Sequence, residues 1–99
     1  MNKPVDIETV PSVPLWIDGK QKPASSTRAG EITNPATGRV TRRVPFCNAA
    51  DIDAAVQAAE RAFPAWRDTP PLRRARILMR FRELLETNKD ELARLITAE

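Results

Sequence analysis

The sequence predicts an α/β chain in which two β-hairpins precede two or three α-helices. Two turn signals predict the hairpins: the pair Asp18-Gly19 between short strand-like runs, and an Asn-Pro turn over residues 34–38. Apolar residues that recur with a period of 3.6 predict the helices, and this pattern is strongest over residues 69–99.

The first hairpin pairs the run Leu-Trp-Ile at 15–17 with a return that starts at Gln21-Lys22. An Asp-Gly pair suits this turn because it tolerates the left-handed backbone that a two-residue hairpin loop requires. A loop of small and polar residues follows over 23–30. The polar, proline-interrupted residues 1–13 are predicted to be a mobile N-terminal tail.

The second hairpin joins a strand over 31–33 to its partner over 39–44. Pro35 presets φ for the turn and Gly38 tolerates the exit geometry. Arg42 falls on the same side as the valines of its strand, so the alternation is imperfect. The pair is therefore predicted to be half-exposed or at the edge of a sheet.

The first helix is predicted to begin after Asn48, with Asp51 three residues on in a capping-box spacing. Its sequence is rich in alanine, which favours a helix and permits close approach to a neighbour. Pro64 is expected to end or kink it. Thr69 is the candidate cap of the next helix, with two prolines in its first turn.

The closing stretch presents one apolar face opposite a charged face, and it forms one long helix or two helices that meet near Asn88 with little change of phase. The pattern indicates an amphipathic helix that docks on another surface, and it identifies no catalytic or binding chemistry. The apolar face comprises Ile77, Leu78, Phe81, Leu84, Leu85, Leu92, Leu95 and Ile96.

This chain is expected to be the beginning of a larger domain. The alanine-rich first helix offers the apolar face too small a partner, and isolated two-stranded hairpins are marginal in water. The pattern also stops at Glu99 without a glycine or asparagine cap.

Composition excludes several classes of function. The net charge of +3 comes from the first half, whereas residues 51–99 carry nine basic and nine acidic side chains. The helices therefore lack the basic surplus that is typical of nucleic-acid modules. With one cysteine and no histidine, the chain cannot form an internal disulfide, a Cys/His zinc site or a Cys–His pair. No signal peptide or membrane span is recognisable, so a soluble, cytoplasmic protein is expected.

Three features could carry a function. The arginine run at 73–82 could bind phosphate, but a solvated helix face explains it better. Arg74 alone in that run lies on the apolar side, where it could pair with a buried carboxylate or carbonyl from elsewhere. Cys47, Trp16 and Trp66 are interpreted as packing residues. The alternative function is a small helical module that binds nucleic acid or an acidic partner through its arginines.

Eight segments of the sequence resemble the aldehyde dehydrogenase superfamily, and within it the coenzyme A-acylating branch that acts on methylmalonate and malonate semialdehydes. The resemblance runs over residues 14–99, and the phenylalanine-containing segment at 81–85 points to the semialdehyde branch. Phe46-Cys47 and the basic pair Arg42-Arg43 depart from the usual pattern without touching a functional motif. The matching segments are 16–20, 32–38, 44–45, 51–56, 62–66, 76–78, 81–85 and 89–93.

The resemblance implies that residues 14–99 are the N-terminal, incomplete part of a Rossmann-type NAD-binding domain. In the complete enzyme a cysteine thiolate would attack the semialdehyde, and NAD would take the hydride. Decarboxylation and transfer to coenzyme A would then give propionyl-CoA or acetyl-CoA, in valine, pyrimidine or inositol catabolism. The resemblance further implies a homotetramer whose partners are the rest of its own chain and the semialdehyde, with neither nucleic acid nor membrane.

The same resemblance implies that no catalytic, cofactor-binding or metal-binding residue lies in this chain, so that the fragment alone is inactive. The nucleophile and the NAD-phosphate loop come later in the family's sequence, and Cys47 is not the catalytic cysteine. In some relatives a backbone carbonyl that matches Ile32 or Thr33 helps to bind a monovalent cation. No metal site is predicted here, because the other ligands come from outside this sequence.

Overall fold

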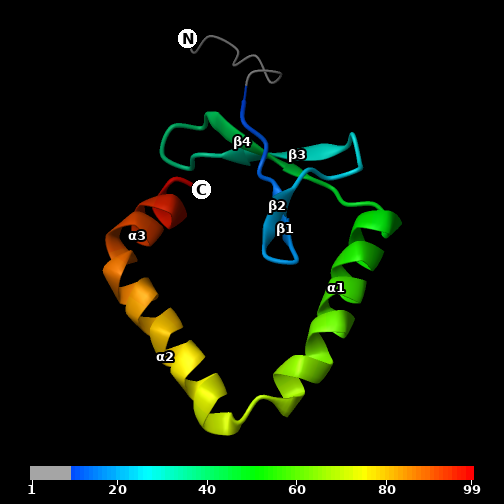
Figure 1. The fold of residues 1–99 in the computed structure, drawn as a ribbon. Helices are drawn as coiled ribbons and strands as arrows, with labels where there is room; N and C mark the ends of the chain where they lie inside the picture. The colour runs from blue at the N-terminus through cyan, green and yellow to red at the C-terminus, as the bar shows by residue number, and fades with distance from the viewer. Residues whose placement is uncertain (1–9) are drawn as a thin grey trace.

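The computed structural model describes residues 10–99 of the chain and contains two separate hairpins followed by three helices (Figure 1). This confirms the predicted order of elements. The hairpins lie together at one end of the molecule, and the helices extend from them. The elements are β1 (Leu15–Ile17), β2 (Lys20–Lys22), β3 (Ala29–Thr33), β4 (Val40–Pro45), α1 (Ala49–Asp68), α2 (Pro71–Thr87) and α3 (Lys89–Thr97).

The first hairpin pairs β1 with β2 in an antiparallel register that sets Trp16 opposite Gln21. Its turn places Asp18 at φ 55° and Gly19 at φ 70°. Two successive residues with positive φ are what a two-residue hairpin loop needs to match the right-handed twist of its strands. The Asp-Gly signal is confirmed.

The second hairpin pairs β3 with β4, also antiparallel, through a turn that Asn34 organises. The Asn34 carbonyl accepts a hydrogen bond from the Gly38 N–H at 2.8 Å, and its side chain accepts one from the Ala36 N–H at 2.9 Å. Gly38 has φ 70°. The strand register shifts between Ile32 and Thr33, and β3 begins two residues before the predicted start of its strand.

The residues just before β1 run beside β4 as a third extended segment. The Val13 N–H donates to the Arg43 carbonyl at 2.8 Å, and the Arg43 N–H donates to the Pro11 carbonyl at 3.0 Å. Of the tail predicted over residues 1–13, the first nine lie outside the described residues. Among the described residues, hydrogen-bonded structure is present from Pro11, three residues before the predicted boundary at Pro14.

Helix α1 begins as predicted, with a capping box at its N-terminus. The Asn48 side chain accepts from the Asp51 N–H at 3.0 Å, and the Asp51 carboxylate accepts from the Asn48 N–H at 3.3 Å. Pro64 does not end the helix, which continues to Asp68 with this proline inside it.

The prediction that Thr69 caps the second helix is wrong, because Thr69 instead closes α1. Its N–H donates to the Trp66 carbonyl at 3.2 Å and its hydroxyl donates to the Ala65 carbonyl at 2.7 Å. Pro70 holds the cap position of α2 without a side-chain hydrogen bond. A threonine four residues after a free helix carbonyl can satisfy that carbonyl, which is how the C-terminal end of α1 uses it.

Helices α2 and α3 meet at Asn88, so the second of the two predicted alternatives is correct. The Asn88 N–H and side-chain amide both donate to the Leu84 carbonyl, at 3.0 and 2.8 Å. Its side chain does not cap α3. The interruption lasts one residue, and the apolar pattern continues through it.

The described residues contain no buried hydrophobic side chain. Beyond the two hairpins, the one substantial contact between elements is that of α1 with β1. Figure 1 shows α1 and the α2–α3 pair diverging from the turn that joins them, so these helices do not pack on one another. The radius of gyration is 17.9 Å, whereas a compact domain of this length has about 13 Å. Within residues 10–99, the apolar faces of α2 and α3 are therefore left exposed.

Candidate functional site

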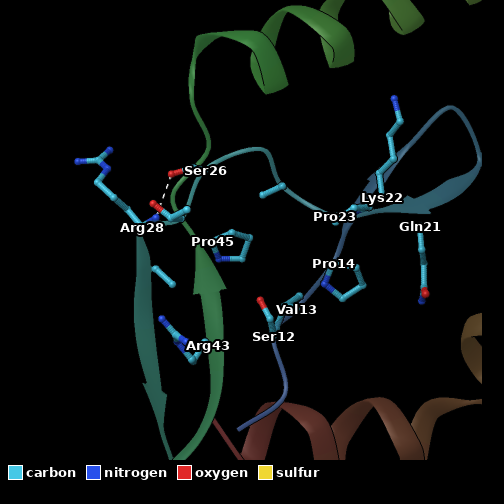
Figure 2. Close-up of a pocket in the computed structure, with 13 residues that line it drawn as sticks. Ser12, Val13, Pro14, Gln21, Lys22, Pro23, Ser26, Arg28, Arg43 and Pro45 are labelled. Carbon is cyan, nitrogen blue, oxygen red and sulfur yellow. Dashed lines mark hydrogen bonds between the residues drawn. The ribbon is translucent and has the colours of Figure 1, made fainter. Parts of the chain in front are cut away.

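A hollow of about 530 Å³ lies between the two hairpins (Figure 2). Its wall comes from the return of the first hairpin, the loop into β3, the segment before β1 and the strand β4. Pro14, Pro23 and Pro45 stand around it, and Figure 2 shows the Lys22 and Arg28 side chains pointing away from these prolines.

The lining of this hollow contains no histidine or carboxylate that could activate its serine and threonine hydroxyls. It contains three basic residues, Lys22, Arg28 and Arg43, and no cysteine, aspartate or glutamate. General acid–base catalysis most often uses histidine or a carboxylate, and neither lines the wall. The volume suits a small ligand, but the residues give it no chemistry.

The one buried polar residue among those described is Asp51, at 7% exposure. Its carboxylate accepts from the Ser25 N–H at 3.1 and 3.2 Å and from the Ser25 hydroxyl at 2.7 Å, besides the Asn48 N–H. The Ser25 hydroxyl lowers the pKa of Asp51 most strongly, burial opposes this, and the two backbone N–H groups and Lys22 lower it further. Hydrogen bonds to the charged form stabilise a carboxylate, so Asp51 is a structural anion that holds the loop to α1.

Sequence analysis found the capping role of Asp51 but missed Ser25. The two residues lie 26 positions apart, and no local pattern connects a loop serine to a distant helix cap.

Cys47 is half-buried and has a free thiol. It lines a smaller hollow between β1 and α1 together with apolar residues that include Leu15, Ile52 and Val56. These neighbours agree with its interpretation as a packing residue.

The remaining candidates lie apart from one another. Trp16 is 70% exposed and Trp66 41% exposed, so neither is in a core of this chain. The arginines of α2 are exposed except for Arg74, which is half-buried; Arg80 pairs with Glu83 at 3.0 Å. No hollow brings the tryptophans and the arginine run together.

The described residues do not fit NAD. A dinucleotide loop places glycines between a strand and the first turn of a helix so that the backbone approaches phosphate. Here Gly19 and Gly38 lie in hairpin turns, and a Cβ at Gly30 would meet the Phe46 ring at 2.9 Å. The junction into α1 is Phe46-Cys47-Asn48, without glycine. No step of a reaction can be assigned to NAD through these side chains.

Within residues 10–99 there is no group of three potential metal ligands. The helices of this part of the chain also lack a segment long and apolar enough to cross a membrane.

Comparison with known proteins gives a consistent picture. The profile of the aldehyde dehydrogenase family matches residues 21–99. The mouse mitochondrial methylmalonate-semialdehyde/malonate-semialdehyde dehydrogenase [acylating] is 48% identical over 91 residues, which are 92% of this chain and 17% of that protein. Malonate-semialdehyde dehydrogenase 1 of Geobacillus kaustophilus is 45% identical over 84 residues, 85% of this chain and 17% of its own. The chain thus spans about a sixth of the length of these relatives.

Solved structures show the same arrangement of elements. A methylmalonate-semialdehyde dehydrogenase from Oceanimonas doudoroffii superposes with a TM-score of 0.87 at 40% identity, over 91% of this chain and 18% of that one. A Sinorhizobium meliloti protein assigned to the same activity was solved with NAD. It superposes with a TM-score of 0.89 at 42% identity, over 92% of this chain and 18% of that one. By its sequence, its hairpins and its helices, the chain belongs to the aldehyde dehydrogenase family.

Proposed function

We propose that this chain is the N-terminal portion of an NAD-dependent, coenzyme A-acylating (methyl)malonate-semialdehyde dehydrogenase. The complete enzyme would convert the semialdehyde to propionyl-CoA or acetyl-CoA, in valine, pyrimidine or inositol catabolism. NAD would be the oxidant and coenzyme A the acyl acceptor. Residues 14–99 would form the first, incomplete part of its NAD-binding domain.

The observation that carries this proposal is a well-defined fold without a core. The hairpins and helices superpose on a methylmalonate-semialdehyde dehydrogenase with a TM-score of 0.87, although no hydrophobic side chain is buried in residues 10–99. The accessible surface is 8552 Å², whereas a compact monomer of this mass exposes roughly 5,700 Å². Elements that diverge without packing on one another take their places through contacts with other polypeptide.

The chain's role in that enzyme is structural. We propose that none of its residues is catalytic, binds a cofactor or binds a metal, and that the isolated chain is inactive. Its partner is the remainder of the enzyme, assembled as a homotetramer without nucleic acid or membrane. The cytoplasm is the proposed compartment, although the mammalian relatives carry the word mitochondrial in their names.

A chimera tests the proposal. The segment of the Oceanimonas doudoroffii enzyme that aligns with this chain is replaced by residues 10–99, and NADH and propionyl-CoA are measured with methylmalonate semialdehyde, NAD and coenzyme A. The chimera should be active, whereas the same enzyme without the segment, and the isolated chain, should not be. A chimera that folds without forming propionyl-CoA would remove the assignment, and so would an isolated chain with NADH-forming activity.

A further inference from the structure

Arg74 is the arginine that α2 places among apolar side chains. On a helix that turns about 100° per residue, Arg74 lies about 20° from Phe81, within the face that carries Ile77 and Leu78. The other four arginines of this run lie about 80° or more from Phe81 by the same geometry. They are Arg73, Arg76, Arg80 and Arg82.

The guanidinium of Arg74 lacks an acceptor in the described chain. Its Nε is buried and has no hydrogen-bond partner. The ion pairs of residues 10–99 are Arg67–Asp68 and Arg80–Glu83, and neither involves Arg74. An arginine cannot lose its charge in a protein, so a buried N–H of this group needs an oxygen from somewhere.

Neither the helix dipole nor a neighbouring side chain of α2 stabilises the charge of Arg74. Arg74 lies at the fourth residue of α2, near the positive end of the helix dipole, and the first turn of α2 contains no acidic residue. The position is therefore unfavourable for a cation unless an anion approaches it from outside the helix.

We propose that Arg74 is the polar anchor of an apolar docking face on α2, and that its guanidinium binds a carboxylate from the polypeptide that completes the enzyme. This inference rests on the proposed function, since the curated relatives are about five times as long as this chain. Two features select the occupant. The exposed Ile77, Leu78 and Phe81 call for an apolar surface, and the guanidinium of Arg74, whose buried Nε has no acceptor, fits a carboxylate with two hydrogen bonds.

A buried cation with one matched anion also fixes how the surfaces meet. Apolar attraction has no preferred direction, whereas a buried charge pair is satisfied in one register only. Arg74 would thereby set the position of α2 along its partner.

Four variants of the active chimera test the inference by thermal unfolding. Arg74→Met keeps most of the apolar stem and leaves the carboxylate unpaired, so the melting temperature should fall by roughly 6 °C or more. Arg74→Lys keeps the charge and should lose about half as much. Arg74→Gln supplies a neutral donor and should lower the melting temperature as much as Arg74→Met does. The control, Arg76→Met on the charged side of α2, should stay within about 2 °C.

The outcomes separate the two proposals. A wild-type chimera that does not form propionyl-CoA overturns the proposed function, and this inference with it. If that chimera is active but Arg74→Met has the same melting temperature as Arg76→Met, the Arg74 side chain contributes packing alone and the inference is wrong. If Arg74→Gln and Arg74→Lys lower the melting temperature equally, the partner of Arg74 is a neutral carbonyl, and the proposed carboxylate is wrong. Where the methionine variant does not fold, the lysine and glutamine variants decide.

Discussion

Asp51 and Ser25, 26 positions apart, are joined by three hydrogen bonds, of which the shortest runs from the Ser25 hydroxyl to the Asp51 carboxylate at 2.7 Å. The same carboxylate accepts from the Asn48 N–H and completes the capping box of α1. The Asp51 side chain thus binds the loop at Ser25, helps to cap the N-terminus of α1, and connects the hairpin region to that helix.

The pH dependence of stability should reveal this connection. The pKa of Asp51 is lowered from 3.8, so folding favours its charged form. The contribution is complete above the unfolded value and is lost as the pH falls through the lower folded value. In unfolding experiments on the chimera, wild type should exceed Asp51→Asn in stability at pH 6, and the difference should shrink as the pH falls below about 4.

The control for this experiment is Asp53→Asn, in the same turn, where the aspartate is exposed and bonds only to Gln57. Its effect at pH 6 should be smaller than that of Asp51→Asn. Equal effects of the two variants would mean that the carboxylate of Asp51 acts through the helix dipole and not through Ser25.

Removal of the Asn48 cap should destabilise the chimera by about 1 kcal/mol, because one N–H in the first turn of α1 loses its acceptor. Asn48→Ala and Asn48→Ser can be compared by chemical denaturation. Serine also caps helices well and should restore most of the loss. If serine were no better than alanine, the Asn48 side chain would act by some contact other than the cap.

The turn of the second hairpin depends on the backbone of Gly38, which has φ 70° and donates to the Asn34 carbonyl. A side chain there meets no neighbouring atom, so the cost of substitution comes from the backbone alone. Gly38→Ala should destabilise the chimera by about 1 kcal/mol, and Gly38→Asn by less, because asparagine tolerates left-handed backbone. Denaturant midpoints of the two variants check this order, and an alanine variant as stable as asparagine would contradict it.

Local chemistry made the two hairpin turns and the N-terminal cap of α1 predictable. The Asp18-Gly19 turn, the turn at Asn34 and the box between Asn48 and Asp51 each depend on residues within a few positions of one another. The strongly periodic apolar face likewise identified α2 and α3.

Contacts between distant residues were not predictable from the same patterns. The pairing of Val13 with Arg43 and the bonds of Ser25 to Asp51 connect segments that share no local signal. Thr69 can cap either neighbouring helix by its position in the sequence, and only the structure shows that it serves α1. The apolar pattern of a helix likewise does not identify the surface that covers it, and only the structure shows that α1 and the α2–α3 pair diverge.

The apolar face of α2 should matter only in the complete enzyme. Leu85 is 42% exposed, so Leu85→Asp should leave the helix content of the isolated chain nearly unchanged in circular dichroism. In the chimera the same change should remove a leucine worth roughly 1.5–3 kcal/mol and add a charge at an interface, which is enough to abolish folding and NADH formation. Met79, 63% exposed on the opposite side of α2, gives the matched control. If Met79→Asp and Leu85→Asp impaired the chimera equally, the face that docks would not be the one that carries Phe81 and Leu85.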